Sequence, residues 1–239
     1  MSLDVVSIAI LSDNYSFIVQ SADKVAVIDP GDAAPLIEYL EQNNLTPDYI
    51  FNTHHHWDHT DGNKEIAQKY NAQIIAPRAE KSKIGHIDIG LNDNEIFKFG
   101  DTYFKAIETK GHTQGHLCLW FEGENILFSG DMIFAMGCGR PFEGDAHDLY
   151  ESFQKLSFLP DETVIYFGHE YTQTNGHFSL SIAPTDTAIL SRMESINRLR
   201  RHNKPTIPTT MKIERETNLF MRAKNPAAFK TLRDNRNNF

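Results

Sequence analysis

The stretch T-H-H-H-W-D-H, residues 53–59, constrains this chain more than any other. It contains four of the eleven histidines in the sequence. Imidazole rings are poor core material, because each carries a polar nitrogen that needs a partner, but they are good ligands for a transition metal. The stretch follows the apolar, β-prone run Tyr49-Ile50-Phe51, so we expect the chain to enter it extended. The pattern therefore predicts a metal site at the end of a strand.

An extended chain directs alternate side chains to opposite faces. Alternation would place His54, His56 and Asp58 on one side. It would direct His55 to the other side, with Trp57 packed beneath. A chance histidine patch or the relic of a tag is a poor explanation, because tags lie at chain termini and contain no Trp-Asp. We therefore expect three of these side chains to face one metal site.

His59 would rejoin the cluster if the chain turns at Asp58. Four ligands within a few residues could then serve two adjacent ions rather than one. A structural zinc site is the main alternative, and such sites normally use cysteine thiolates. Cys118 and Cys138 lie far apart and form no C-x-x-C motif, so a cysteine-based structural zinc is not expected.

Length and charge limit the other possibilities. The 239 residues fit one large domain, or one domain with a smaller appendage. The formal charge of -9 argues against a nucleic-acid partner or an anionic membrane, because such binders neutralise phosphates with basic side chains. An N-terminus without basic residues, an apolar run too short to span a bilayer and a low cysteine content predict a cytoplasmic protein.

The order of the predicted elements suggests a layered arrangement of helices and sheets. Three antiparallel strands are expected first, and strand and helix then alternate. Strands are predicted at residues 5–11, 15–20, 24–28, 49–51, 72–76, 125–128 and 163–167, within 95–121, and helices at 33–43, 63–70, 148–159 and 185–203.

Three further polar residues each follow a glycine at the end of a predicted strand: His112, Asp131 and His169. We expect them to meet the histidine stretch at one edge of the sheet. Seven ligands are enough for two ions roughly 3.5 Å apart with a bridging carboxylate. His116 is expected to pack or to support a ligand, whereas four other histidines are expected at the surface or at helix caps: His86, His147, His177 and His202.

The character of the chain changes after Tyr171, where a polar segment, residues 172–176, precedes the predicted helix 185–203. We place a domain boundary there, between residues 1–171 and 172–239. The basic run 198–204 is interpreted as helix-end charges rather than a nucleic-acid patch, because cations complement the helix dipole at a C-terminus.

Other catalytic chemistries fit the sequence less well. The run Gly137-Cys138-Gly139 lacks the third glycine of a dinucleotide-binding loop. No G-x-S-x-G nucleophile elbow is present, and Cys138 has no evident base partner.

Taken together, T-H-H-H-W-D-H, G-H-T-Q-G-H, S-G-D, G-C-G-R-P-F-E-G and G-H-E-Y-T resemble the metallo-β-lactamase superfamily. Within it the chain resembles the glyoxalase II family, the hydroxyacylglutathione hydrolases, almost from end to end. The H-x-H-x-D-H motif alone indicates the superfamily. The G-C-G loop, G-H-E-Y and the N-x-F-x-R pattern at residues 218–222 indicate the subfamily.

The resemblance implies an α+β fold, an αββα sandwich followed by a small helical domain that binds substrate. It implies hydrolysis of S-D-lactoylglutathione to D-lactate and glutathione, the step that completes methylglyoxal detoxification, by a hydroxide between two divalent ions. Zinc is the expected metal, with iron or manganese as alternatives. His54, His56 and His112 would hold the first ion and Asp58, His59 and His169 the second, with Asp131 bridging and Asp58 also orienting the nucleophile.

The family's glutathione-binding positions correspond here to Arg140, Phe142, Tyr171, Arg233 and Arg236. Arg140 and Arg236 stand where other members have lysine, and Phe142 where some have tyrosine. Arg233 and Arg236 are three residues apart, so a helix would place them on one face, where they could bind a carboxylate. The alternative is that this pair forms ordinary solvated surface charge.

Several rival functions remain compatible with the motifs. They are another hydrolase of the same fold, such as a nuclease or a lactonase, a persulfide dioxygenase, and a metal-binding module without catalysis. The acidic net charge argues against a nuclease. Asp29, at the end of a predicted strand, is either a partner for a ligand histidine or a turn-capping residue. A monomeric chain is expected.

Overall fold

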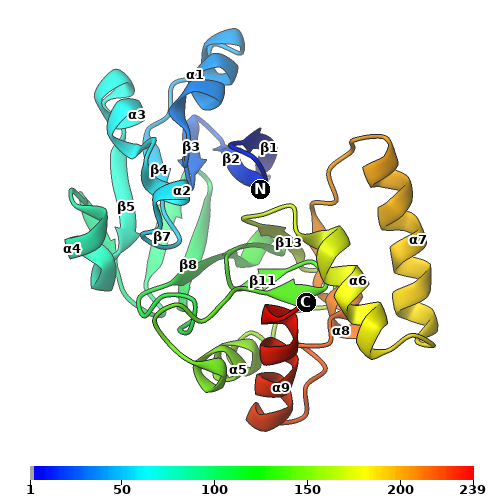
Figure 1. Ribbon diagram of the computed structural model, residues 1–239. Helices are drawn as coiled ribbons and strands as arrows, with labels where there is room; N and C mark the ends of the chain where they lie inside the picture. The colour runs from blue at the N-terminus through cyan, green and yellow to red at the C-terminus, as the bar shows by residue number, and fades with distance from the viewer. Residues whose placement is uncertain (1–2) are drawn as a thin grey trace.

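The computed structural model of the protein describes residues 3–239. Within them, two six-stranded sheets pack face to face, with helices on both outer faces (Figure 1). This is the α+β sandwich that the resemblance implied. No helix of this described part is both long and apolar enough to cross a membrane.

The first sheet begins with the expected antiparallel strands and continues with parallel ones. Its order is β1 (Asp4–Ile10), β2 (Asn14–Ser21), β3 (Lys24–Ile28), β4 (Tyr49–Phe51), β5 (Gln73–Pro77) and β6 (Ile89–Leu91). In β2, Phe17 and Val19 enter the core between the sheets, whereas Ile18 packs on the other side beneath the helices. Burial on both faces explains why the run Phe17-Ile18-Val19 in this strand shows no alternation with polar residues.

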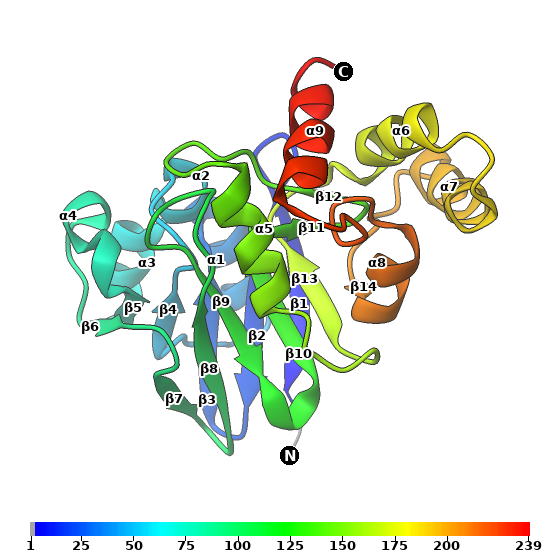
Figure 2. The ribbon, with the colours of Figure 1, turned by 90° about the horizontal axis from the view of Figure 1, so that it is seen from below.

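The second sheet has the order β14 (Thr209–Thr210), β13 (Val164–Phe167), β10 (Ile126–Gly130), β9 (Leu117–Phe121), β8 (Thr102–Glu108) and β7 (Ile96–Phe99). β9 is buried along its whole length, with Leu119 and Phe121 between the sheets and Cys118 and Trp120 on the outer face. A small hairpin pairs β11 (Ile133–Phe134) with β12 (Gly137–Cys138). Figure 2 shows this hairpin below α9.

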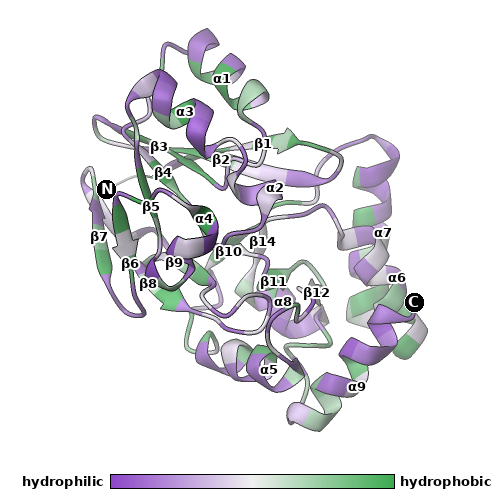
Figure 3. Cartoon of the chain, turned by 60° about the vertical axis from the view of Figure 1, so that its left-hand side comes forward, coloured by the Kyte–Doolittle hydropathy of each residue, from purple (hydrophilic) through white to green (hydrophobic). Residues whose placement is uncertain are grey.

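The helices divide between the two outer faces. α1 (Ala33–Gln42) and α3 (Asn63–Tyr70) cover the first sheet, and α5 (Ala146–Lys155) covers the second (Figures 1 and 2). The remaining helices are α2 (Trp57–Thr60), α4 (Lys81–Ile84), α6 (Thr172–Ile182), α7 (Thr187–Arg201), α8 (Met211–Thr217) and α9 (Pro226–Asn237). Hydrophilic residues lie along α1, α3, α7 and α9 in Figure 3, as expected for helices with one face in solvent.

The segment 172–176, predicted to be a polar connection, is instead the start of α6. Sequence periodicity misses this helix because Phe178 is the one apolar residue among those it buries, beside Thr172, Asn175, Gly176 and Ser179. α6 lies close against α7: a Cβ added at Gly176 would stand 1.9 Å from Met193 Sδ. Tertiary packing therefore stabilises a helix that the local sequence pattern does not predict.

The C-terminal region also fixes the loop that joins β11 to β12. Glu214 is fully buried and accepts the backbone N–H of Met136 at 2.8 Å. The amide of Asn218 donates to the carbonyl oxygens of Phe134 and Gly137 at 3.2 and 3.0 Å. A loop that would otherwise leave buried carbonyl groups without donors is thus held by residues from α8 and its C-terminal end.

Candidate active site

The structure brings all seven predicted ligands together, but from two sheets rather than from one sheet edge. The histidine stretch follows β4 of the first sheet, whereas the other three residues follow strands of the second sheet. The seven are His54, His56, Asp58, His59, His112, Asp131 and His169. A sandwich places corresponding edges of its two sheets side by side, which is why segments distant in sequence meet there.

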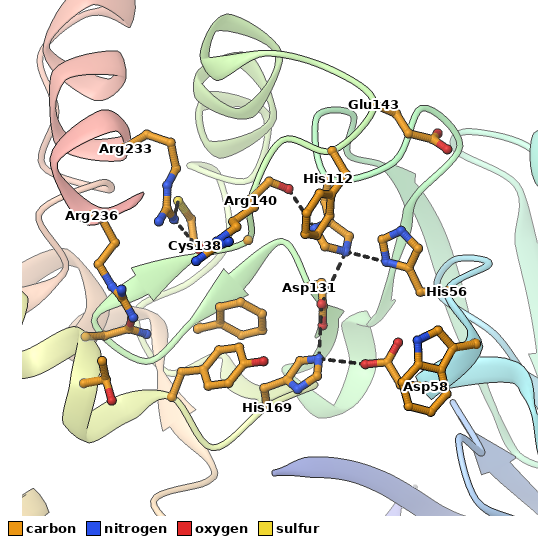
Figure 4. A pocket seen from close by; sticks show the side chains of 17 residues that line it. His56, Asp58, His112, Asp131, Cys138, Arg140, Glu143, His169, Arg233 and Arg236 are labelled. Atoms are coloured by element: carbon orange, nitrogen blue, oxygen red, sulfur yellow. Dashed lines mark hydrogen bonds and ion pairs between the residues drawn. The ribbon is translucent and has the colours of Figure 1, made fainter. Parts of the chain in front are cut away.

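The first group of ligands consists of His54, His56 and His112, whose nitrogen atoms lie within 4.8 Å of one another. His56 Nδ1 is 3.1 Å from His54 Nε2. It is also 2.9 Å from His112 Nε2, an interaction drawn in Figure 4. Three converging imidazole nitrogens beside an accessible pocket match the ligand set of a catalytic metal with an open position.

The second group consists of Asp58, His59 and His169, again within 4.8 Å. His169 Nε2 is 3.4 Å from both His59 Nε2 and Asp58 Oδ2. Asp131 lies between the two groups: its Oδ2 is 3.3 Å from Nε2 of both His112 and His169. One carboxylate therefore reaches both ligand groups.

One observation that does not depend on the motifs also indicates that these residues suit the binding of two cations. Asp131 Oδ1 is buried and accepts no hydrogen bond, a costly state for a carboxylate oxygen unless a cation completes it. Gly168 leaves the necessary space, since a Cβ there would stand 2.4 Å from Asp131 Oδ1. The donor set and the unpartnered oxygen both suit divalent metal binding.

Burial controls the protonation of the first group. It lowers the pKa of His54 well below the usual range and also lowers the pKa of His56. Burial lowers the pKa of His112 to about 4, although the Asp131 carboxylate opposes the shift. All three rings are therefore neutral at pH 7, the form in which imidazole binds a metal.

Charge dominates around the second group. Burial is the largest single effect and disfavours the charged forms of His59 and His169, but the Asp131 carboxylate, together with Asp29 beside His59 and Asp13 beside His169, outweighs burial and raises the pKa of both rings. Burial likewise disfavours ionised Asp131, yet the surrounding histidines, His169 foremost, hold its pKa well below the usual range. A buried carboxylate that stays ionised requires positive charge nearby, which a divalent ion would supply.

A second layer of residues orients the ligands. Asp29 accepts the backbone N–H of Thr53 at 2.8 Å, and its other oxygen is 3.1 Å from His59 Nδ1. Of the two roles expected for Asp29, the structure shows the contact with a predicted ligand histidine, His59. His116 is fully buried and accepts the backbone N–H of Asp131, a predicted ligand, at 3.2 Å, so it packs in the interior and also contacts the site. Such partners fix the ring orientation and tautomer of ligands.

Sequence reasoning missed two supporting residues where the turn after β1 leads into β2. Asp13 Oδ1 is 2.8 Å from His169 Nδ1, and the Asn14 amide donates to Asp58 Oδ2 at 2.9 Å. The turn-like composition of Ser12-Asp13-Asn14 gives no sign of these roles, because the contacts lie 156 residues away along the chain for Asp13 and 44 residues away for Asn14. The four histidines assigned to the surface, His86, His147, His177 and His202, are all exposed, as predicted.

The local geometry of the histidine stretch differs from the prediction in one respect. β4 ends at Phe51, the chain bends at Thr53 and His54, and α2 begins at Trp57, so Asp58 and His59 enter the site from a helical turn. Trp57 consequently does not pack beneath the cluster: its side chain is 62% exposed. His55 does point away, because its ring bonds to Glu80 instead of the ligands.

A pocket of about 920 Å³ opens beside the two ligand groups. All five predicted substrate-binding residues line it: Arg140, Phe142, Tyr171, Arg233 and Arg236. The Tyr171 ring stacks on the His169 ring at a centroid distance of 4.7 Å, and the exposed Phe142 ring lies 5.3 Å from that of His112. Figure 4 shows the arginine side chains on one side of the pocket and the ligand groups on the other.

The two arginines of α9 share one face of the helix, as predicted, but differ in their surroundings. Arg233 is only 3% exposed, so it is not a solvated surface charge. Its guanidinium donates to the carbonyl oxygen of Cys138 at 2.9 Å and lies 5.3 Å from the centre of the Phe220 ring. Arg236 is half-buried and donates to Asn175 Oδ1 at 3.2 Å.

Replacing Arg233 with alanine should lower the free energy of unfolding by about 1.5 to 3 kcal/mol, the usual worth of a hydrogen bond to a charged group. Urea denaturation measures the change. Lys230→Ala, which removes an exposed cation from the same helix, is the control and should have little effect. Equal effects from both variants would contradict the anchoring role of Arg233.

The sequence matches known protein families over nearly its whole length. Residues 10–169 match the metallo-beta-lactamase superfamily, and residues 170–239 match the hydroxyacylglutathione hydrolase C-terminus. A hydroxyacylglutathione hydrolase of Pelagibacter ubique (strain HTCC1062) is 41% identical over 239 residues, with 99% of this chain and 100% of that protein covered. One from Rhizobium etli is 42% identical over 218 residues, with 90% and 85% covered.

Solved structures show the same fold at lower identity. ETHE1 from Myxococcus xanthus superposes with a TM-score of 0.75 at 20% identity, covering 98% of this chain and 91% of that one. A protein solved in a di-iron-bound form has a TM-score of 0.67 at 21% identity, with 91% and 99% covered. These similarities bear on the fold alone.

Proposed function

The chain belongs to the hydroxyacylglutathione hydrolases of the metallo-β-lactamase superfamily, and we propose that its site hydrolyses the thioester S-D-lactoylglutathione to D-lactate and glutathione. The proposal rests on one observation. Residues from both metal-ligand groups and three arginine side chains line the same pocket. A thioester with an anionic peptide moiety needs both features, the first for cleavage and the second for binding.

We assign His54, His56 and His112 to a first ion, Asp58, His59 and His169 to a second, and Asp131 to both. Zinc is proposed, with iron or manganese as alternatives, because histidine and shared carboxylate ligands accept all three. When bound, the ions lower the pKa of water toward about 7 and polarise the thioester carbonyl.

The protein's own residues would then position the reactants. Asp58 faces the pocket with an oxygen held by the Asn14 amide, so it can orient the attacking water and accept its proton. The departing thiolate of glutathione has a free-thiol pKa of about 8.5 and needs little help from a general acid. Burial and Asp13 raise the pKa of the Tyr171 hydroxyl in this pocket. Tyr171 can therefore act as a hydrogen-bond donor rather than as a base.

The glutathione moiety would lie against Arg140, Phe142, Tyr171, Arg233 and Arg236. Burial and repulsion from Arg233 and Arg140 lower the pKa of Arg236. Three cations gathered without a carboxylate partner in the described contacts favour an anionic ligand, because its binding relieves their mutual repulsion. In this proposal residues 1–171 supply the metal centre and residues 172–239 supply substrate contacts, in a monomeric cytoplasmic enzyme without nucleic-acid or membrane partners.

A hydrolysis assay at the thioester absorbance tests the proposed activity. S-D-lactoylglutathione should be cleaved, whereas an N-acetylcysteamine thioester with the same acyl group should be cleaved with a much lower kcat/KM, because it lacks the glutathione carboxylates. Removal of metal by a chelator should abolish turnover, and elemental analysis should find up to two ions per chain.

Faster cleavage of a phosphodiester than of either thioester would contradict the proposal. Full activity with one tightly bound ion would contradict the dinuclear centre but leave the substrate assignment standing.

A further inference from the structure

Glu80 is a buried carboxylate that has no part in the proposed reaction. Its side chain, at the junction of the turn 78–80 with α4, is among the least exposed in the protein, at 1% for the residue. Both of its oxygens are occupied: Oε1 accepts the Thr113 hydroxyl and the backbone N–H of Gly115, the latter at 3.0 Å. Oε2 lies 3.0 Å from His55 Nδ1.

These partners belong to the two segments that supply the first ligand group. His55 stands between His54 and His56, and Thr113 directly follows His112. The contact is close, because a Cβ added at Gly115 would stand 2.4 Å from Glu80 Cγ. One buried carboxylate therefore ties the two ligand-bearing segments to each other across a distance of more than fifty residues in the sequence.

The other nitrogen of His55 is also engaged. His55 Nε2 is 3.5 Å from Glu143 Oε1, and Glu143 accepts the backbone N–H of Gln114 at 2.9 Å. Glu80, His55 and Glu143 are close enough for a cation by distance alone. However, the filled oxygens of Glu80 and the pairing of Glu143 with Lys83 describe a completed network of hydrogen bonds.

We propose that Glu80 is a positioning residue for the first ligand group, holding the 54–56 and 112–115 segments in the arrangement that binds a metal. The inference rests on the proposed function. An isolated buried charge is unfavourable, so the three donors keep Glu80 in place, and Glu80 in turn restricts both segments to one geometry. The proposal distinguishes Glu80 from Asp13 and Asp29, which contact ligands of the second group.

The test is the zinc affinity of the full-length chain, measured by competition with a chromophoric chelator after metal removal. Glu80→Gln keeps the shape of the side chain but turns one acceptor into an amide donor that faces other donors. It should weaken the binding of one ion by about 10- to 100-fold, as is usual when an outer partner of a ligand is lost.

Two backgrounds decide which group is affected. With His169→Ala, which disables the second group, Glu80→Gln should still weaken zinc binding by the full factor. With His56→Ala, which disables the first group, Glu80→Gln should cause almost no further loss of zinc affinity. The segments that Glu80 holds in place no longer bind an ion in that background. An equal loss in both backgrounds would overturn the proposal.

Glu214→Gln is the matched control, since Glu214 is also fully buried and accepts bonds on both oxygens. It should lower Tm while zinc affinity stays unchanged, so a comparable loss of zinc affinity would also overturn the proposal. If Glu80→Gln does not fold, Thr113→Val, which removes one buried donor to Glu80 without changing shape, is judged by the same criterion.

The outcomes separate this inference from the function on which it rests. A wild-type chain that binds none of zinc, iron and manganese would overturn the proposed function and this inference with it. A wild-type chain that binds two ions, beside a Glu80→Gln chain that binds both as tightly, overturns the inference alone.

Discussion

Replacing Asp131 with alanine should remove both metal binding and turnover. Asp131 Oδ2 lies 3.3 Å from a histidine nitrogen of each ligand group, and its other oxygen is buried, accepts no hydrogen bond and lies 3.4 Å from His59 Nε2. Without this carboxylate, two divalent ions would face each other with less negative charge between them. Loss of one preorganised electrostatic group typically costs about 10²- to 10³-fold in kcat, and a shared ligand should cost at least the upper value.

Elemental analysis and steady-state thioester hydrolysis measure the two effects together. Asp58→Ala is the comparison, because Asp58 belongs to the second group alone and its loss should spare the first ion. An Asp131→Ala chain that keeps both ions and more than a tenth of the wild-type kcat would show that Asp131 does not bridge. Circular dichroism of both variants excludes unfolding as the cause.

Replacing Arg236 with alanine should raise KM for S-D-lactoylglutathione by about 10- to 150-fold. Arg236 lines the pocket and is held toward it by Asn175. A hydrogen bond to a charged group is worth roughly 1.5 to 3 kcal/mol, which corresponds to this range in affinity. A glutathione carboxylate does not change charge when the thioester is cleaved, so the loss should fall equally on ground and transition states and leave kcat nearly unchanged.

Lys230→Ala on the outer face of α9 controls for a general loss of positive charge. It should leave KM unchanged, because Lys230 pairs with Asp234 in solvent rather than lining the pocket. A KM unchanged in Arg236→Ala would remove Arg236 from the binding site. A collapse of kcat would instead mean that α9 shapes the metal centre.

Sequence alone predicted the strands around the site well, because their apolar runs and glycine ends are local properties. The strand before the histidine stretch, the strand before Asp131 and the strand before His169 all appear where expected. The resemblance of the motifs supplied the family, and the comparisons confirm it. Ligand residues carried by short motifs could be named because metal chemistry restricts side-chain type so strongly.

Periodicity failed where local preference and tertiary packing disagree. Strand periodicity predicted an extended chain beyond His56, but α2 begins at Trp57, whose side chain is exposed to solvent. Periodicity also missed α6, whose buried residues are polar or small apart from Phe178 and which is stabilised against α7. In both cases the conformation depends on contacts with distant parts of the chain, and a local sequence pattern does not predict such contacts.

The sequence by itself determined which residues could bind metal and that α9 would present two arginines on one face. Only the tertiary structure decided that the ligands come from two sheets, that Arg233 is buried against Cys138 and Phe220, and that Glu80 joins both segments of the first ligand group. The physical reason is that ligand identity is a property of one side chain, whereas burial and hydrogen-bond partnership are properties of pairs that folding brings together.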